Sequence, residues 1–467
     1  MMKYSTGRWM RVARIVVSLA MLAGVTAAVA TGYATVLCRM QIVPALLSCS
    51  GLWLVAWVAV TALFGRVYCS SVCPLGTLQD LFIAVSRRRR RGFFYRPPRT
   101  ALRWCVVAVA VGAALLGIGL VTSLLDPYAA YARMEVYLAL PLVRPVAVSL
   151  LAGAVAGVTL LVVALCALLA GRTICTSVCP VGTLLGALST YSLYHMDIDT
   201  DRCTGCNRCV RRCKAQCIDP SSHTVDVSRC VVCFDCVAAC RDGAITYRRG
   251  RHRLRMPMLQ PVGGAGSAGC DAPAAAKTEP VPLSRREFIA GIMSLTAAAA
   301  SGRRPVSLEP LNHVCPPGAG EDFDVKCVSC GACVSVCPAG IIVPSGGELG
   351  WRNALHPVLD FNRGACLYDC TDCTHACPTG ALQPLTSGEK HRFVLGQARI
   401  EPSQCFMYLG DGACGACVRR CPRRAITVVT LADGRRLPQV DFDACIGCGE
   451  CRHVCPADPP AWIIEGR

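Results

Sequence analysis

The sequence predicts a multi-domain fold in which a four-helix transmembrane block is followed by α+β ferredoxin-like domains that each hold two clusters. Two observations lead to this prediction. The first 170 residues contain four long apolar runs, whereas the sequence beyond residue 200 is polar and rich in turns. The chain also holds 35 cysteines in 467 residues, and most of them recur in short motifs of the polar part.

The apolar runs are each long enough to cross the hydrocarbon core of a bilayer, which takes about 20 residues as a helix. Buried helices of a large soluble core are excluded, because too little polar sequence lies among the runs to cover such a core. The predicted spans are residues 12–37, 42–64, 102–125 and 146–170. Together they define a membrane domain over residues 1–190.

Basic residues in the short connections predict the orientation of this domain, because Lys and Arg collect on the cytoplasmic side. Residues 1–14 and the connection 87–103 are strongly basic, whereas the other two connections carry little charge. Both ends of the block should therefore face the cytoplasm. These residues account for much of the net charge of +18, so nucleic-acid binding is excluded as the meaning of that charge.

A repeat follows the second and fourth spans. Residues 65–78 read GRVYCSSVCPLGTL and residues 171–184 read GRTICTSVCPVGTL, so the block consists of two tandem halves. Cysteines four apart lie on one face of a helix, and the two Cys-x3-Cys-Pro motifs therefore offer four thiolates to a metal or redox site at the membrane surface. Two alternatives are structural thiols packed at helix ends and two separate dithiol–disulfide couples. The cysteines concerned are Cys69, Cys73, Cys175 and Cys179.

Six further groups of four cysteines follow the Cys-x2-Cys-x2-Cys-x3-Cys pattern or a variant of it. Such a turn brings three thiolates together, and the fourth cysteine ligates the neighbouring cluster in two-cluster ferredoxins. Disulfide scaffolds belong to short secreted chains, and structural zinc prefers two separated pairs of cysteines. We therefore expect about six 4Fe-4S clusters.

Exchange of the fourth cysteine within each adjacent pair of motifs predicts the ligand sets. They are Cys203, Cys206, Cys209 with Cys240; Cys230, Cys233, Cys236 with Cys213; Cys327, Cys330, Cys333 with Cys377; Cys366, Cys370, Cys373 with Cys337; Cys405, Cys414, Cys417 with Cys455; and Cys445, Cys448, Cys451 with Cys421. Cys217 is an alternative to Cys213, and the wide spacing between Cys405 and Cys414 makes the fifth set irregular. The cysteines outside all motifs are expected to be unligated, and they include Cys38, Cys49, Cys105, Cys166, Cys270 and Cys315.

The order of these features resembles known membrane iron–sulfur proteins. Four helices, two Cys-x3-Cys-Pro motifs and a two-cluster ferredoxin domain (195–250) resemble the NapH type, which includes the NosR membrane domain. The four-motif region (306–467) resembles exported polyferredoxins of the NapG/MauM type. Between them lie a flexible linker rich in Gly, Ala and Pro (251–283) and a segment, 284–305, whose start (SRREFI) is similar to a twin-arginine export signal.

The resemblance implies a fusion of the two types, with quinol as the electron donor and a periplasmic reductase or a cytochrome as the acceptor. The resemblance also implies a multi-pass protein of the bacterial inner membrane whose C-terminal domain is periplasmic. The sequence shows no nucleotide-binding Gly-rich turn and no recognisable Ser/His/Asp or paired-carboxylate arrangement, so no catalytic residue is assigned and electron relay is favoured. The alternatives are a factor that matures or reactivates a partner metalloenzyme, and a redox sensor. Whether the chain is itself an enzyme, as part of a quinol dehydrogenase, stays open at this stage.

Overall fold

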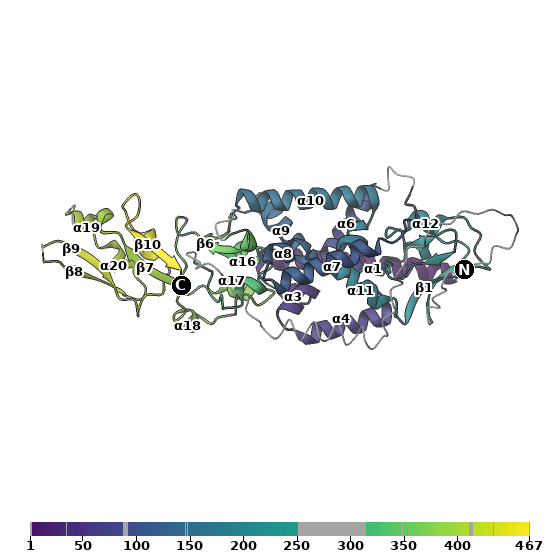
Figure 1. Ribbon diagram of the computed structural model, residues 1–467, viewed down its shortest axis with the longest axis horizontal. Coiled ribbons are helices and arrows are strands. Elements are labelled where there is room, and N and C mark those ends of the chain that lie inside the picture. Colours follow the sequence, from purple (N-terminus) through teal and green to yellow (C-terminus); the bar gives the residue numbers. More distant parts are fainter. Residues whose placement is uncertain are drawn as a thin grey trace, which may run out of the picture.

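The computed structural model describes residues 2–33, 35–86, 92–144, 146, 148–250, 314–346, 350–410, 414–432 and 434–466. The molecule is elongated, with a helical block in the middle and small units of short strands and helices at both ends (Figure 1). The predicted linker, the twin-arginine-like segment, Cys270 and the arginine run at 87–91 lie outside the described residues.

Residues 1–190 form helices, but only two of these helices are single long apolar spans. α1 (Met2–Thr31) and α10 (Leu150–Ala170) contain stretches that are long and apolar enough to cross a membrane. The second and third predicted spans are each divided into two shorter helices, which are α3 (Ile42–Leu47) and α4 (Gly51–Phe64), and α7 (Thr100–Leu115) and α8 (Gly119–Leu125). Four uninterrupted spanning helices are therefore not found among the described residues.

Both interruptions have local causes that hydropathy does not register. Between α3 and α4, Cys49 adopts a positive φ of 54°, and the hydroxyls of Ser48 and Ser50 bond to each other at 2.8 Å. Between α7 and α8, Gly117 has a φ of 67°, the left-handed conformation that ends many helices. Each break stops the helical hydrogen-bond pattern without adding a charged residue, so the apolar run continues through it.

The two sequence halves pack crosswise in the block. α10 packs on α6 (Pro74–Ser86), and α4 packs on α11 (Pro180–Ser189). Each helix that precedes a Cys-x3-Cys-Pro motif thus contacts the helix that follows the other motif, which is a pseudo-twofold arrangement. The remaining short helices of the block are α2 (Val36–Arg39), α5 (Val67–Ser71), α9 (Pro127–Met134), the π-helical turns η1 (Glu135–Ala139) and η3 (Ile174–Val178), and the 3-10 turn η2 (Leu140–Leu142).

The first ferredoxin unit lies at the end of the block where α1 begins (Figure 1). Gly7 on α1 leaves room for Val237, which would lie 2.7 Å from any Cβ at position 7. Arg11 Nε also lies 2.8 Å from Asp235 Oδ1. The unit consists of the antiparallel pairs β1 (Tyr194–Ile198) with β4 (Ile245–Arg249) and β2 (Ile218–Asp219) with β3 (Thr224–Val225), and of α12 (Arg208–Arg212) and α13 (Asp235–Ala239).

The C-terminal region lies at the opposite end of the block (Figure 1). Gly32, just past the end of α1, leaves room for Val336, and Ser335 Oγ donates to the Val29 carbonyl at 2.7 Å. The part in contact with the block contains α15 (Phe323–Lys326), α16 (Ala332–Val336), β5 (Ile342–Pro344), η4 (Trp351–Asn353), β6 (Pro357–Leu359), α17 (Asp372–Ala376) and α18 (Ser387–Lys390). β5 and β6 pair antiparallel.

The last part of the chain forms a further unit beyond this one. The amide of Cys366 donates to the Cys448 carbonyl at 2.9 Å, so the two units join directly at two predicted cluster ligands. The elements are β7 (Gly396–Ile400), η5 (Pro402–Gln404), α19 (Phe406–Leu409), α20 (Ala416–Arg420), β8 (Ile426–Thr430), β9 (Arg436–Val440), α21 (Glu450–His453) and β10 (Trp462–Gly466). β7 pairs with β10 and β8 with β9, both antiparallel.

Candidate metal centres

One local structure recurs at five of the six cysteine motifs. A five-residue helix carries the third cysteine at its second position, and the fourth cysteine follows directly as the C-cap with φ from −63° to −80° and ψ from 103° to 115°. This extended conformation ends the helix and turns the chain away from it. The C-cap cysteines are Cys213, Cys240, Cys337, Cys377 and Cys421. In the sixth motif, Val454 is the C-cap of α21 and Cys455 follows it.

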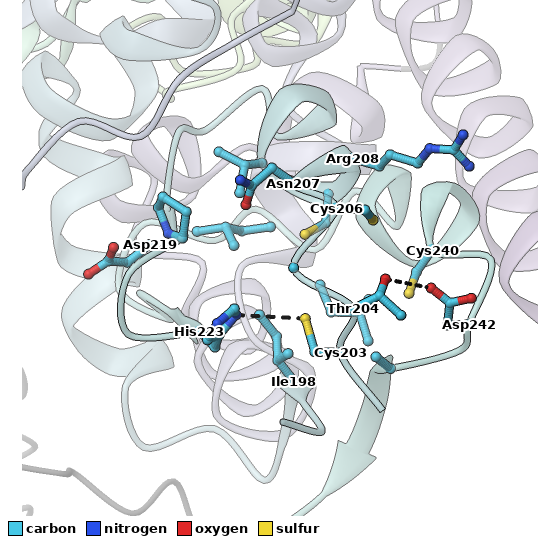
Figure 2. A pocket seen from close by; sticks show the side chains of 17 residues that line it. Ile198, Cys203, Thr204, Cys206, Asn207, Arg208, Asp219, His223, Cys240 and Asp242 are labelled. Atoms are coloured by element: carbon cyan, nitrogen blue, oxygen red, sulfur yellow. Dashed lines mark hydrogen bonds between the residues drawn. The ribbon is translucent and has the colours of Figure 1, made fainter. Parts of the chain in front are cut away.

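The first ferredoxin unit contains a cavity lined by cysteines of both motifs (Figure 2). Cys203, Cys206 and Cys209 come from the first motif and Cys240 from the second, whereas Cys213 does not line this cavity. His223 Nδ1 lies 3.6 Å from Cys203 Sγ, and Thr204 Oγ1 donates to Asp242 Oδ2 at 3.0 Å beside Cys240. The structure therefore brings together the four cysteines of the first predicted ligand set.

Two further cavities repeat this arrangement in the C-terminal region. One is lined by Cys327, Cys330, Cys333 and Cys377, and the other by Cys405, Cys414, Cys417 and Cys455. In both, the fourth cysteine comes from the neighbouring motif. The irregular spacing after Cys405 does not remove it from its group, because α19 begins directly after Cys405 and the chain returns to the same cavity at Cys414.

The thiols of the other three predicted sets influence one another's ionisation. Burial and then repulsion from Cys233, Cys230 and Cys213 raise the pKa of Cys236. Burial, with repulsion from Cys366, Cys337 and Cys370, likewise raises the pKa of Cys373. Burial also raises the pKa of Cys448 to about 12, with contributions from Cys421 and Cys445. Buried thiols that lie together, with pKa values raised in this way, lose their protons only when bound positive charge offsets the negative charge of the thiolates. The donor sets therefore fit iron–sulfur clusters.

Among the described residues, the structure holds no group of three or more His, Cys, Asp or Glu side chains arranged to hold a single metal ion. The preference for clusters over zinc therefore rests on the spacing of the cysteines along the sequence.

Cys217 lies beside the second ligand set. Its sulfur is 3.5 Å from that of Cys213, and its side chain also forms a hydrogen bond with Cys230. Cys213 nevertheless occupies the C-cap position that its four counterparts occupy, whereas Cys217 lies in the following loop. The geometry therefore favours Cys213 as the fourth ligand and Cys217 as a neighbour of the site.

The structure also reveals polar residues that the sequence did not single out. His223 lies beside the first set, and buried Lys390 donates to the carbonyls of Leu367 and Cys370 next to the Cys366 set. Asp80 accepts from Arg172, Lys214 and Arg14 between the helical block and the first ferredoxin unit. A lone histidine, lysine or aspartate forms no pattern in the sequence, so only the fold could find these three.

The comparisons with known proteins agree with these sites. Residues 326–382 and 412–458 each match a model described as a 4Fe-4S dicluster domain, and residues 50–92 and 151–191 match a 4Fe-4S binding domain. The methylamine utilization ferredoxin-type protein MauM of Methylobacillus flagellatus is 32% identical over 185 residues, which is 37% of this chain and 76% of that protein. This chain belongs to the MauM/NapG family of ferredoxin-type proteins.

Other relatives support the same assignment. MauM of Methylorubrum extorquens is 33% identical over 38% of this chain and 86% of that protein. The ferredoxin-type protein NapG of Escherichia coli is 34% identical over 31% of this chain and 67% of that protein. No solved structure matches. The expected NapG/MauM relationship and the 4Fe-4S chemistry are thus confirmed, and the chain is an electron-transfer iron–sulfur protein.

Iron analysis tests the number of clusters. If each of the six motifs holds a four-iron cluster, together they contribute about 24 iron atoms and as much acid-labile sulfide. Iron and sulfide would be measured on anaerobically purified full-length protein. A preparation that holds zinc and cannot be reconstituted with iron and sulfide would contradict the assignment.

Proposed function

We propose that this chain is a membrane-bound polyferredoxin that passes electrons from quinol, through 4Fe-4S clusters, to a periplasmic reductase or cytochrome. One observation carries the proposal: cluster-binding units dock at both ends of a single helical block. α1 contacts α13 near its first turns and α16 near its last. Its 30 residues span about 45 Å at 1.5 Å per residue, similar to a bilayer with its headgroup regions.

The surface of the block supports insertion into a membrane. In the apolar stretches of α1 and α10, only 28% and 22% of the residues are buried, whereas the core helices of a soluble protein are mostly buried. Large side chains such as Val16, Leu52, Val109 and Leu161 are more than half exposed. Water-exposed apolar area of this extent is unfavourable, and lipid would cover it.

The positions of the connections support the proposed orientation. The basic residues lie at the end of the helical block that carries the first ferredoxin unit; they are in the N-terminal segment and at Arg96, Arg99 and Arg103. At this end, Arg229 Nη1 donates to the Arg96 carbonyl, and Arg103 Nη1 donates to Ser228 Oγ. Cytoplasmic loops collect such residues. The C-terminal region occupies the other end, which would be the periplasmic side. Its expected route there, an internal twin-arginine-like signal at 284–305, remains part of this proposal.

The four C-terminal ligand sets lie in a row that suits stepwise electron transfer. The Cys333 and Cys373 thiols interact electrostatically, which links the set nearest the block to the second set. The Cys366 amide bonds the Cys448 carbonyl, which links the second set to the third. The Cys451 and Cys417 thiols link the third to the fourth. Electrons that enter at the Cys327 set would leave from the Cys405 set, far from the block.

We propose Glu135 as the group that takes a proton from quinol. It lies on η1, which contacts both α1 and α16, and neither of its carboxylate oxygens has a hydrogen-bond partner although only 7% of the residue is exposed. Burial raises its pKa to about 8. Quinol oxidation releases protons, and a buried carboxyl group with this pKa exchanges protons readily near neutral pH.

Glu135→Gln should therefore lower the rate of quinol-dependent cluster reduction about 100-fold, the usual effect of losing a proton acceptor. Because the basic form is needed, the wild-type rate should rise as the pH passes through about 8, and this rise should disappear in the variant. Cluster bleaching at visible wavelengths would be followed after adding quinol. Glu135→Asp should retain part of the activity, and unchanged kinetics in Glu135→Gln would exclude this role.

The full chain in liposomes tests the whole proposal. Quinol in the bilayer should reduce the clusters and, through them, an impermeant acceptor on the side of the C-terminal region only. No reduction by any quinol, together with loss of a partner metalloenzyme's activity when the gene is deleted, would favour the alternative that the protein matures or reactivates that partner.

A further inference from the structure

The two Cys-x3-Cys-Pro motifs meet about the pseudo-twofold axis of the block and hold each other by matching contacts. Arg66 Nη2 donates to the Cys175 carbonyl at 3.0 Å, and Arg172 Nη1 donates to the Cys69 carbonyl at 2.8 Å. Each arginine thus bonds the first cysteine of the other motif. Gly76 and Gly182 let the backbones approach this closely, because a Cβ on either would lie within 2.4 Å of the carbonyl oxygen of the first cysteine of its own motif.

The second cysteine of each motif has a matching environment as well. The sulfur of Cys179 accepts the Gly182 amide at 3.3 Å, and that of Cys73 accepts the Gly76 amide. Both sulfurs therefore lie at the first turn of a helix, where α6 and α11 offer free N–H groups to negative charge. Cys73 also interacts electrostatically with Cys69, Cys175 and Cys179, so the four thiols share one neighbourhood.

The charges around the four thiols do not share the symmetry of the backbone. Arg172 is paired with Asp80, whose Oδ1 lies 2.8 Å from Arg172 Nε. The position equivalent to Asp80 in the other half is Gly186, where a Cβ would collide with the Ser228 carbonyl at 2.4 Å. Arg66 is consequently fully buried with no carboxylate partner among the described residues, and its Nε has no partner at all.

A buried guanidinium without a counter-charge is costly, and the nearest group that can supply one is sulfur. Arg66 Nη2 lies 3.7 Å from Cys69 Sγ. Four thiolates carry more negative charge than the core of a 4Fe-4S cluster offsets, so a cluster held by them is an anion. A neutral set of four thiols would leave Arg66 unpaired.

We propose that Cys69, Cys73, Cys175 and Cys179 together ligate one additional 4Fe-4S cluster on the pseudo-twofold axis, with Arg66 as its counter-ion. The match of both segments to a 4Fe-4S binding domain favours a cluster over a single ion. This centre deepens the proposed electron relay and rests on it only for its role. It would lie between the helical block and the first ferredoxin unit, because Arg172 also donates its amide to the Lys214 carbonyl, next to Cys213.

Iron content and spectroscopy of the full-length protein test the proposal. Cys69→Ser and Cys175→Ser should each lose about four iron atoms relative to the wild type, and the double variant should lose no more than either single one, since the ligands serve one centre. Cys166→Ser, a single cysteine on α10, is the control and should lose none. Losses that add in the double variant, or none in folded single variants, would overturn a shared cluster.

Native mass spectrometry of the wild type gives a result that depends on no variant. Seven clusters per chain agree with the proposal. Six clusters, one zinc ion in addition to six clusters, or a Cys69–Cys73 disulfide after mild oxidation would each overturn it. These outcomes are independent of quinol oxidation, so the extra cluster and the proposed function can fail separately.

Arg66→Gln tests the counter-ion. Removing the positive charge should shift the midpoint potential of this centre to a more negative value in a redox titration followed by electron paramagnetic resonance, whereas Arg66→Lys should restore most of the shift. A merely structural role for Arg66 would leave the potential unchanged in every variant that keeps the cluster, and that result would reject Arg66 as the counter-ion.

Discussion

Replacing Cys330 by serine is expected to halt electron transfer into the C-terminal region and to destabilise the unit that holds it. Cys330 belongs to the set nearest the helical block. Its neighbour Gly331 packs against Tyr137 of the block so closely that a Cβ at position 331 would lie 3.0 Å from Tyr137 Oη. The other three sets lie beyond it. Quinol should then reduce none of these three at an appreciable rate, whereas dithionite in solution should still reduce those that remain assembled.

The loss of stability has a separate cause. The strands of this unit are only three residues long, and its core includes Cys327, Cys333, Cys373 and Cys377 themselves. Metal–thiolate binding energy becomes folding energy where the empty site does not form by itself. Whole domains are stable by only about 5–15 kcal/mol, so losing the binding energy of one cluster removes much of this margin. Because unfolded protein is degraded in cells, the accumulated level of folded protein should fall about tenfold or more.

Cys315→Ser is a matched control, because Cys315 lies in the same unit but lines none of the three cysteine cavities. It should accumulate normally and keep all of its iron. Protein level would be measured by immunoblotting and folding by protease resistance. If Cys330→Ser accumulates and resists protease as the control does, the cluster does not support the fold of this unit.

The grouping of the cysteines around common cavities could be predicted from the sequence because the pattern that determines it is local. Three ligands of each set lie within one short turn, and the exchange of the fourth follows from the pairing of motifs, as the cavity around Cys203 and Cys240 illustrates. Cys405 joins its predicted partners in spite of the wide spacing before Cys414, because α19 takes up part of the chain between these two cysteines.

The helical block was harder to predict because its departures depend on single backbone conformations. Cys49 and Gly117 interrupt apolar runs without changing their hydropathy. The carboxylate of Asp80, buried beside the motifs, also escaped prediction. Asp80 and Gly186 occupy equivalent positions of the repeat, yet one binds three cations and the other admits a carbonyl group. Such asymmetry becomes visible only when the two halves are folded together.

Asp80→Asn is expected to be the most damaging single change of charge between the block and the first ferredoxin unit. The Asp80 carboxylate pairs with Arg172 at 2.8 Å, with Lys214 at 3.0 Å and with Arg14. Arg172 is fully buried, and Arg14 and Lys214 are almost so. Lys214 keeps a second partner, Asp235, at 3.1 Å, whereas no other carboxylate pairs with Arg172 or Arg14 among the described residues. Removing one partner from buried ion pairs typically costs about 3–5 kcal/mol, because the remaining charges stay buried without compensation.

The measurement is the thermal unfolding midpoint of the detergent-purified protein, with Asp199→Asn as the control. Asp199 forms an exposed pair with Arg202 at 3.4 Å, and such pairs contribute about 0–1 kcal/mol.

Burial would raise the pKa of Asp80, but Arg172, Lys214 and Arg14 outweigh it and hold the pKa well below its ordinary value. The Asp80 carboxylate therefore stays charged at every pH above the ordinary pKa of an aspartate. Its contribution to the stability of the folded protein is lost only in strong acid. The difference between Asp80→Asn and the wild type should accordingly be the same from about pH 6 to pH 8, and a variant as stable as Asp199→Asn would show that the three cations do not depend on Asp80.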